Sequence, residues 1–302
     1  MTDTSDARVA VVLITHNGWP RLARTLRHLT TLPERPPVVV VDNASTDETT
    51  EALRRDFPAV EVIALPDNRG AGGRNVGVAA VRTPYVAFAE DDSWYEPGAL
   101  ATATELLDAH PEIALINAHV LVGEDRRVEP LHADMLETPL PADRDDLPGH
   151  RILSFLEGAS VIRRSAFMAA GGFDRRFPIG GPEEHLAADL LAHGWELRYV
   201  PEVIARHVPD HKAPSPTVRR MGVRNALWFA WERRPVMQAL RWTAHVVRTS
   251  PANAATARGL VDALRALPRL RSRRRPLPPH VEADMQLLDE SKMRSGARSY
   301  RS

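Results

Sequence analysis

Three consecutive acids, Glu90-Asp91-Asp92, have the type and spacing for metal chemistry. They follow directly on the apolar run Tyr85–Ala89, whose residues predict a strand. Carboxylate oxygens suit Mg²⁺ or Mn²⁺, and the rest of such an ion's shell is water and substrate phosphate. The chain has no cysteine, so any metal must be bound by oxygen or imidazole. The alternative for this cluster is a solvated acidic turn.

A second acidic pair, Glu183-Glu184, follows Gly180-Gly181-Pro182 and precedes a helical pattern. Either carboxylate could act as a general base, although acids at a helix start are also simply favourable with the helix dipole. His207 ends the predicted strand Val203–Arg206 and is a candidate imidazole ligand, more natural for Mn²⁺ than for Mg²⁺. A structural histidine is the alternative, and His211 is a second choice of ligand.

Polar residues also end two earlier strand patterns, as Thr15-His16-Asn17 and as Asp42-Asn43. In an open parallel sheet these ends lie at one edge, where ligands bind, although Asn and Asp are also common turn residues. The segment Asn68–Gly77 is rich in glycine, which permits close approach to a ligand, and Arg74 carries a permanent charge suited to a diphosphate. It lacks the G-x-G-x-x-G spacing of a dinucleotide site.

As an ordered set, these segments resemble the family-2 glycosyltransferases over roughly residues 8 to 208. The matching segments are Thr15-His16-Asn17, residues 40–47, Asn68-Arg69-Gly70 with residues 73–77, and residues 88–92. Further along, Glu183, Leu186 and Gly194-Trp195 match the family's spacing around its catalytic base. Glu90 stands where the family's DxD motif has its first Asp, and Pro182 replaces a usual Glu.

The resemblance implies an inverting enzyme of the GT-A fold that moves a sugar from a nucleoside-diphosphate sugar to an acceptor hydroxyl, assisted by Mn²⁺ or Mg²⁺. The acceptor would be a glycan, a lipid-linked sugar or a small molecule. The roles that it implies fall into three groups: metal ligands Asp92, Glu90 and His207; catalytic base Glu183, with Glu184 as the alternative; and nucleotide-sugar contacts Thr15, His16, Asn17, Asp42, Asn68, Gly73, Arg74 and Asp91.

The elements that must position these residues alternate between strand and helix over the first 120 residues. This alternation predicts an α/β fold with a mostly parallel, twisted sheet flanked by helices. Residues 125–150 are polar and predict a loop, and the pattern beyond Pro209 is helical. We therefore expect a catalytic domain over residues 1–209 and a helical C-terminal extension over residues 210–302, with Arg269–Pro279 as a mobile linker.

The charge of the chain is unevenly distributed although its net charge is zero. Residues 210–302 contain 19 Lys and Arg against 7 Asp and Glu, so the remainder is acidic. A basic helical extension suggests peripheral contact with an anionic membrane surface, and packing on the catalytic domain is the alternative. No run is long enough to span a membrane, and the acidic start does not resemble a signal peptide. We expect a cytoplasmic protein that does not bind nucleic acid.

Two other functions are consistent with parts of the pattern. A nucleotidyltransferase shares the fold class and a metal carboxylate site, but usually has a Gly- and Lys/Arg-rich loop after its first strand. Here that loop is Thr15-His16-Asn17-Gly18-Trp19, without lysine. A homologue that binds sugar nucleotides without catalysis is the second alternative, because Glu90 and Pro182 depart from the family's pattern.

Overall fold

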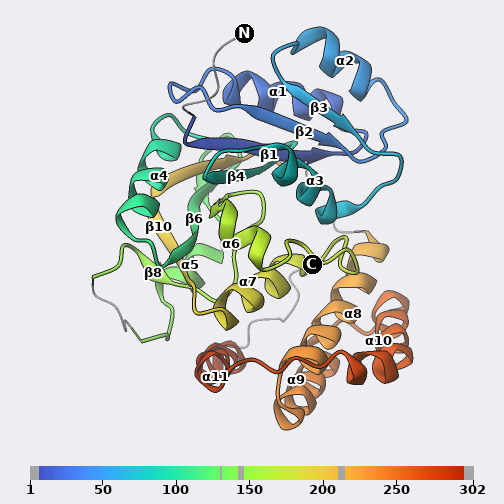
Figure 1. Cartoon of the computed structure of the whole chain (residues 1–302). Coiled ribbons are helices and arrows are strands. Elements are labelled where there is room, and N and C mark those ends of the chain that lie inside the picture. The colour runs from blue at the N-terminus through green and yellow to red at the C-terminus, as the bar shows by residue number, and fades with distance from the viewer. Residues whose placement is uncertain (1–6, 130, 142–145, 210–214, 296–302) are drawn as a thin grey trace.

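The computed structural model describes residues 7–129, 131–141, 146–209 and 215–295. In this part of the chain, helices flank one large twisted sheet, and a group of C-terminal helices lies beside it (Figure 1). The strands are β1 (Val9–Thr15), β2 (Val38–Asp42), β3 (Glu61–Ala64), β4 (Tyr85–Glu90), β5 (Ser93–Tyr95), β6 (Ile113–Val122), β7 (Arg127–Val128), β8 (His150–Arg151), β9 (Ser160–Arg163) and β10 (Glu196–His207). The helices are α1 (Trp19–Leu29), α2 (Thr49–Asp56), the short turn η1 (Gly70–Gly72), α3 (Gly73–Ala80), α4 (Ala99–Ala109), α5 (Leu131–Leu136), α6 (Arg164–Ala169), α7 (Pro182–Ala192), α8 (Pro216–Arg233), α9 (Val236–Thr249), α10 (Ala254–Ser272) and α11 (Pro279–Ser295).

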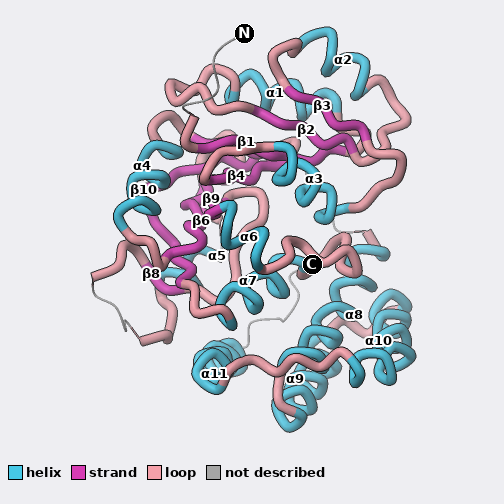
Figure 2. Tube along the Cα trace, viewed as in Figure 1, coloured by secondary structure: helices cyan, strands magenta, loops and turns pink. Residues whose placement is uncertain are grey.

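The strand order is β3-β2-β1-β4-β9-β6-β10-β5, with β7 beside β6 and β8 beside β10. The first four strands in this order pair in parallel, as expected. The remainder is mixed, because β9 lies antiparallel between β4 and β6 and β5 returns antiparallel along β10. The α/β class with flanking helices and a helical C-terminal region is confirmed (Figure 2), and the mostly parallel sheet is corrected to a mixed one.

Alternation along β1 builds the two layers of the core. Val11 and Leu13 point to one face and pack with α1 and α4, while Ala10 and Val12 point to the other and pack with α3, α6 and α7. All five residues of β2 are buried, as expected where helices cover both faces of a parallel sheet. The carboxyl ends of β1, β2 and β4 are consequently held at one edge of a rigid sheet.

Some elements differ from the expected ones. The runs 197–200 and 203–205 are one strand, β10, whose pairing with β6 shifts register between Val200 and Ile204. Helix α2 begins at Thr49 rather than after Ser45 or Thr46, since the Ser45 side chain instead donates to Asp42. The expected loop over 125–150 contains β7 and α5, and β8 begins at His150.

The C-terminal helices pack on the catalytic domain as well as on one another. Helices α8 and α10 approach closely at Gly259, where a Cβ would lie 2.6 Å from the carbonyl oxygen of Arg220. The expected mobile linker over Arg269–Pro279 is wrong for its first four residues, which complete α10, and the segment that follows is hydrogen-bonded to the end of α8. Its backbone N–H groups at Arg275 and Leu277 donate to the carbonyls of Glu232 and Arg233 at 2.9 and 2.8 Å.

Helix α11 then returns toward the sheet (Figure 1). Leu277 and Val281 are buried in the core layer that contains α7, and Asp284 of α11 pairs with Arg151 of β8 at 2.7 Å. A division at residues 209 and 210 borders on the undescribed residues 210–214 and stays a prediction. Among the helices that the structure describes, none has the length and apolarity needed to cross a bilayer.

Candidate active site

The three expected metal ligands lie together at the carboxyl edge of the sheet. Glu90 ends β4, and its N–H donates to Ser93 Oγ at 2.8 Å, which fixes the tight turn through Asp92. Strand β5 then pairs with β10 so that Ser93 lies opposite His207. One ligand atom each from Glu90, Asp92 and His207 all lie within 4.8 Å of one another.

This group fits a divalent cation. The Oδ1 atom of Asp92 is buried and accepts no hydrogen bond from the described residues. His207 Nε2 lies 3.5 Å from it, which is long for a hydrogen bond. Two carboxylates and an imidazole are a reasonable Mn²⁺ set, and a less natural one for Mg²⁺. A cation between these groups would satisfy the buried oxygen.

His207 is electrostatically matched to Asp92. Burial acts to lower the pKa of His207, but the nearby carboxylate of Asp92, together with the charge of Glu90, outweighs burial, and the pKa is raised overall. The protonated ring can therefore substitute for a cation beside Asp92. A bound metal would displace that proton, because only the neutral imidazole is a ligand.

Arg74 lies beneath the acidic edge and not on its surface. Its side chain is fully buried, and its guanidinium pairs with Glu90 at 3.2 Å and with Glu157 at 3.1 Å. The sequence suggested that Arg74 contacts a diphosphate, but such a contact would require it to leave both carboxylates. In this arrangement Arg74 positions Glu90 and compensates its charge.

Glu183 occupies an acidic environment at the start of α7. It lies in the first turn, where the helix dipole favours a charged carboxylate. Burial, followed by the charges of Glu157 and Glu184, nevertheless raises the pKa of Glu183 well above its ordinary value. A carboxylate with a raised pKa is a stronger proton acceptor, as a general base at neutral pH requires.

The charge of Glu90 also raises the pKa of Glu183. The candidate base and the candidate metal ligands therefore belong to one electrostatic cluster. Burial also raises the pKa of Glu157, which sequence reasoning missed. Its sequence, Phe-Leu-Glu-Gly, resembles an ordinary turn before a strand. Gly158 offers a partial signal, because Glu90 packs over its backbone and a Cβ there would lie 2.8 Å from Glu90 Cγ.

The turn after β1 and the loop after β2 are bound together on the side expected to hold the nucleoside. His16 Nδ1 donates to the carbonyl of Asn43 at 2.9 Å, and Asn17 Oδ1 accepts the N–H of Thr46 at 2.8 Å. Asn17 has a left-handed backbone with φ of 52°. His16 and Asn17 are exposed and remain available to a ligand.

Asp42 is buried instead of facing the crevice. Its carboxylate accepts hydrogen bonds from the N–H and hydroxyl of Ser45 at 3.0 and 2.5 Å and from Thr50. Only 1% of Asp42 is exposed, so in this conformation it shapes the loop and cannot contact a base directly. Asn43, which sequence reasoning named with Asp42 as a polar strand end but gave no role, accepts the N–H of Arg69 and donates to the carbonyl of Gly70.

The glycine-rich segment Asn68–Gly77 also makes its polar contacts within the protein. Asn68 Oδ1 accepts the N–H of Gly70 at 2.9 Å, and Gly70 itself has a φ of 53° that favours glycine. Gly73 packs against the Asn43 side chain, where a Cβ would lie 2.8 Å from Oδ1. The N–H of Ala71 donates to the carbonyl of Pro178, which links this segment to the loop before α7.

Asp91 and Thr15 form a separate, part-buried group with Arg21, another residue that sequence reasoning missed. Thr15 Oγ1 donates to Asp91 at 3.1 Å, and Arg21 pairs with the same carboxylate at 3.1 Å. Burial raises the pKa of Asp91 despite these partners. The middle acid of the cluster therefore points away from Glu90 and Asp92 and holds α1 against the turn.

Known proteins share sequence similarity with this chain. A model of the family described as glycosyl transferase family 2 matches residues 10–171. An N-acetylglucosaminyl-diphospho-decaprenol L-rhamnosyltransferase from Mycobacterium tuberculosis is 26% identical over 80% of this chain and 90% of its own length. A pre-mycofactocin glycosyltransferase from the same organism is 32% identical over 68% of this chain and 43% of its own length.

Solved structures show the same fold. TarS of S. aureus, in complex with UDP-GlcNAc, matches 97% of this chain and 93% of its own with a TM-score of 0.63 and 16% identity. The mannosyltransferase PcManGT from Pyrobaculum calidifontis, in complex with GDP-Man and Mn²⁺, matches 96% of this chain and 76% of its own with a TM-score of 0.57 and 19% identity.

Proposed function

Because the chain belongs to glycosyl transferase family 2, we propose that it transfers a sugar from a nucleoside-diphosphate sugar to an acceptor hydroxyl with inversion. One observation carries this proposal: a ligand set for a divalent cation shares an electrostatic cluster with a carboxylate of raised pKa. Family membership makes the chain a glycosyltransferase by kinship and sets aside the nucleotidyltransferase.

The proposed metal ligands are Glu90, Asp92 and His207. A bound Mn²⁺ would stabilise negative charge on the departing diphosphate. Arg74 holds Glu90 from below, and the exposed His16 and Asn17 are the proposed contacts to the nucleoside. In this assignment Asp42, Asp91 and Thr15 shape the site without touching the donor.

Glu183 is the proposed base. Its carboxylate accepts the proton of the acceptor hydroxyl while the hydroxyl oxygen bonds to the anomeric carbon. The bond from that carbon to the diphosphate oxygen breaks in the same displacement, which inverts the anomeric configuration and needs no covalent enzyme intermediate. The half-buried, carboxylate-rich surroundings of Glu183 favour its taking up a proton.

A donor screen tests this function. The purified chain is incubated with GDP-mannose, UDP-GlcNAc and thymidine-diphosphate sugars, and released nucleoside diphosphate is measured with Mn²⁺, with Mg²⁺ and with EDTA. We expect release from one class of donor with Mn²⁺ and at most trace release in EDTA. Undiminished release in excess EDTA would rule out the metal-assisted mechanism.

The acceptor is proposed to be lipid-linked and to be met at an anionic membrane surface. The relative that matches over most of its length is named for a decaprenol-linked substrate. Helix α9 exposes Val236, Met237, Leu240 and Val247, and α10 exposes Val261 and Leu264. Val247 and Leu264 also line an apolar groove of about 180 Å³ between these helices.

Exposed arginines flank these apolar rows. They are Arg241 and Arg248 on α9 and Arg258, Arg265 and Arg269 on α10. An apolar face bordered by arginine suits the interface of a bilayer with anionic headgroups. We therefore assign the proposed membrane contact to the surface formed by α9 and α10. A cytoplasmic location stays a prediction.

A further inference from the structure

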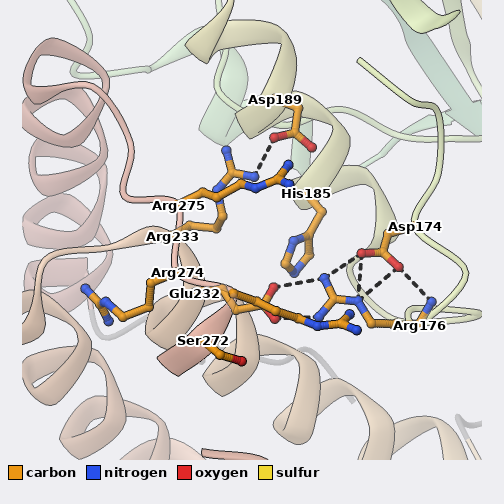
Figure 3. A pocket seen from close by; sticks show the side chains of 10 residues that line it. Asp174, Arg176, His185, Asp189, Glu232, Arg233, Ser272, Arg274 and Arg275 are labelled. Carbon is orange, nitrogen blue, oxygen red and sulfur yellow. Dashed lines mark hydrogen bonds and ion pairs between the residues drawn. The ribbon is translucent and has the colours of Figure 1, made fainter. Parts of the chain in front are cut away.

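A polar cavity of about 460 Å³ lies between α7 and the C-terminal extension (Figure 3). From α7 it is lined by His185 and Asp189, which are one turn apart on a single helix face. Glu183 is two residues before His185 and points about 200° away around the helix. The cavity is therefore behind the proposed catalytic base and separate from the site of transfer.

The three carboxylates of this cavity already have cationic partners. Arg176 pairs with Asp174 at 2.6 Å and with Glu232 at 2.5 Å. Arg233 pairs with Asp189 at 2.5 Å. The acidic side of the cavity is thus neutralised within the protein, and it offers no free carboxylate for a metal ion.

Three further arginines come from the segment that follows α10, so the lining has five arginines and three carboxylates. Arg274 donates to the carbonyls of Trp231 and Arg234 at 2.6 and 2.7 Å, which anchors the segment. The guanidinium groups of Arg273 and Arg275 are exposed and have no acidic partner among the described residues. The lining carries an excess of two positive charges.

His185 supplies an unused polar atom inside this cavity. The residue is 4% exposed, and its Nε2 is buried without a hydrogen-bond partner among the described residues. Its ring stacks on Phe177 at 3.8 Å and lies between the Arg176 and Arg233 ion pairs (Figure 3). Burial lowers the pKa of His185 to about 3, so the neutral ring can donate one N–H without adding charge.

We propose that this cavity binds a phosphate or diphosphate group, held by Arg273, Arg275 and the Nε2–H of His185. The excess charge matches such a group, and the arginine fork suits its oxygens. The volume is in the range of small-molecule sites, about 300 to 1,000 Å³. The ligand is a free phosphorylated compound or the headgroup of an anionic lipid. By contacting both α7 and the segment that follows α10, the bound ligand stabilises the packing of the C-terminal extension against α7.

Titration calorimetry of the full chain with inorganic pyrophosphate tests the proposal. EDTA is present throughout, so that binding at the metal-dependent donor site does not contribute. We expect one site, weakened about tenfold or more in Arg273→Gln/Arg275→Gln, since charged hydrogen bonds are lost. The control Arg54→Gln/Arg82→Gln removes the same charge from exposed positions outside the cavity and should bind like the wild type.

His185→Phe keeps an aromatic ring against Phe177 but removes the nitrogen. We expect it to fold with an unfolding temperature no lower than that of the wild type, and to lose most of the stabilisation by pyrophosphate. Absence of binding to the wild type at millimolar pyrophosphate, or equal weakening in the control, would overturn the proposal. Neither result bears on sugar transfer, which is measured with metal and donor.

Vesicles with and without phosphatidic acid distinguish the two sources. Weaker binding of Arg273→Gln/Arg275→Gln to phosphatidic acid, with the control unchanged, identifies a lipid headgroup. Equal vesicle binding by both variants, together with the calorimetric loss, identifies a free phosphorylated compound. Both outcomes support a phosphate site in the cavity.

Discussion

Glu183 and Glu184 are adjacent on α7 and point about 100° apart, so one of them is better placed to serve an acceptor. Burial raises the pKa of Glu183, and the charges of Glu157, Glu184 and Glu90 raise it further. Replacing Glu183 by Gln keeps its size and removes its basicity. We expect Glu183→Gln to lower the transfer rate about 10²- to 10⁴-fold while donor binding survives.

Glu184→Gln is the matched control and should have the milder effect in the same assay. If Glu183→Gln is active and Glu184→Gln is not, the base is one residue further along. The pH profile gives an independent check. A base must be deprotonated to act, so kcat/KM should rise with pH through the raised pKa of Glu183 and then level off.

Arg74 is the buried cation of the site and compensates two carboxylates, Glu90 and Glu157. We expect Arg74→Gln to lower the free energy of unfolding by roughly 3 to 5 kcal/mol, because the carboxylates are left without a counter-charge. Denaturant unfolding measures this change. Glu157→Gln in the Arg74→Gln background should recover part of the loss, and no recovery would show that the pair is not coupled.

At the scale of elements, α9 and α10 form the surface proposed to meet a membrane. Leu240→Ser/Leu264→Ser removes two exposed apolar side chains, 47% and 64% exposed, and should weaken binding to anionic vesicles without affecting the fold. Binding should also weaken as salt rises, because arginines contribute to it. Cosedimentation with vesicles measures both effects.

Met168→Ser/Val128→Ser is the control, since these residues are also about half exposed but lie on the catalytic domain. It should bind vesicles like the wild type. Equal partition into neutral and anionic vesicles would count against electrostatic docking. Sedimentation that shows a dimer, abolished by Leu240→Ser/Leu264→Ser, would assign the surface to a second copy of the chain.

At the scale of the whole molecule, the metal site connects two distant parts of the sequence, the turn after β4 and the end of β10. An ion bound only by the folded chain stabilises it by about 2.7 kcal/mol at a concentration of 100 Kd. We therefore expect Mn²⁺ to raise the unfolding temperature by several degrees. Asp92→Ala should abolish the increase, and the surface variant Glu105→Ala should retain it. An equal increase in Asp92→Ala would place the stabilising ion elsewhere.

Much of this molecule is determined by local sequence. The continuous apolar runs Val9–Ile14 and Val38–Val41 predict a sheet covered on both faces, and periodic leucines predict the helices that cover it. Parallel pairing then brings the ends of β1, β2 and β4 to one edge, so the acidic cluster and the polar turns were predictable as neighbours.

The pairing of β5 with β10 and the direction of each polar side chain were decided only by the tertiary structure. His207 reaches Asp92 because two strands more than 100 residues apart pair antiparallel, and no local pattern encodes that register. Arg74, Asp42 and Asp91 looked like ligands by residue type, yet Arg74 and Asp42 are buried, and all three are held by internal partners. Residue type predicts which groups can bind, but burial and available partners decide which of them remain free to do so.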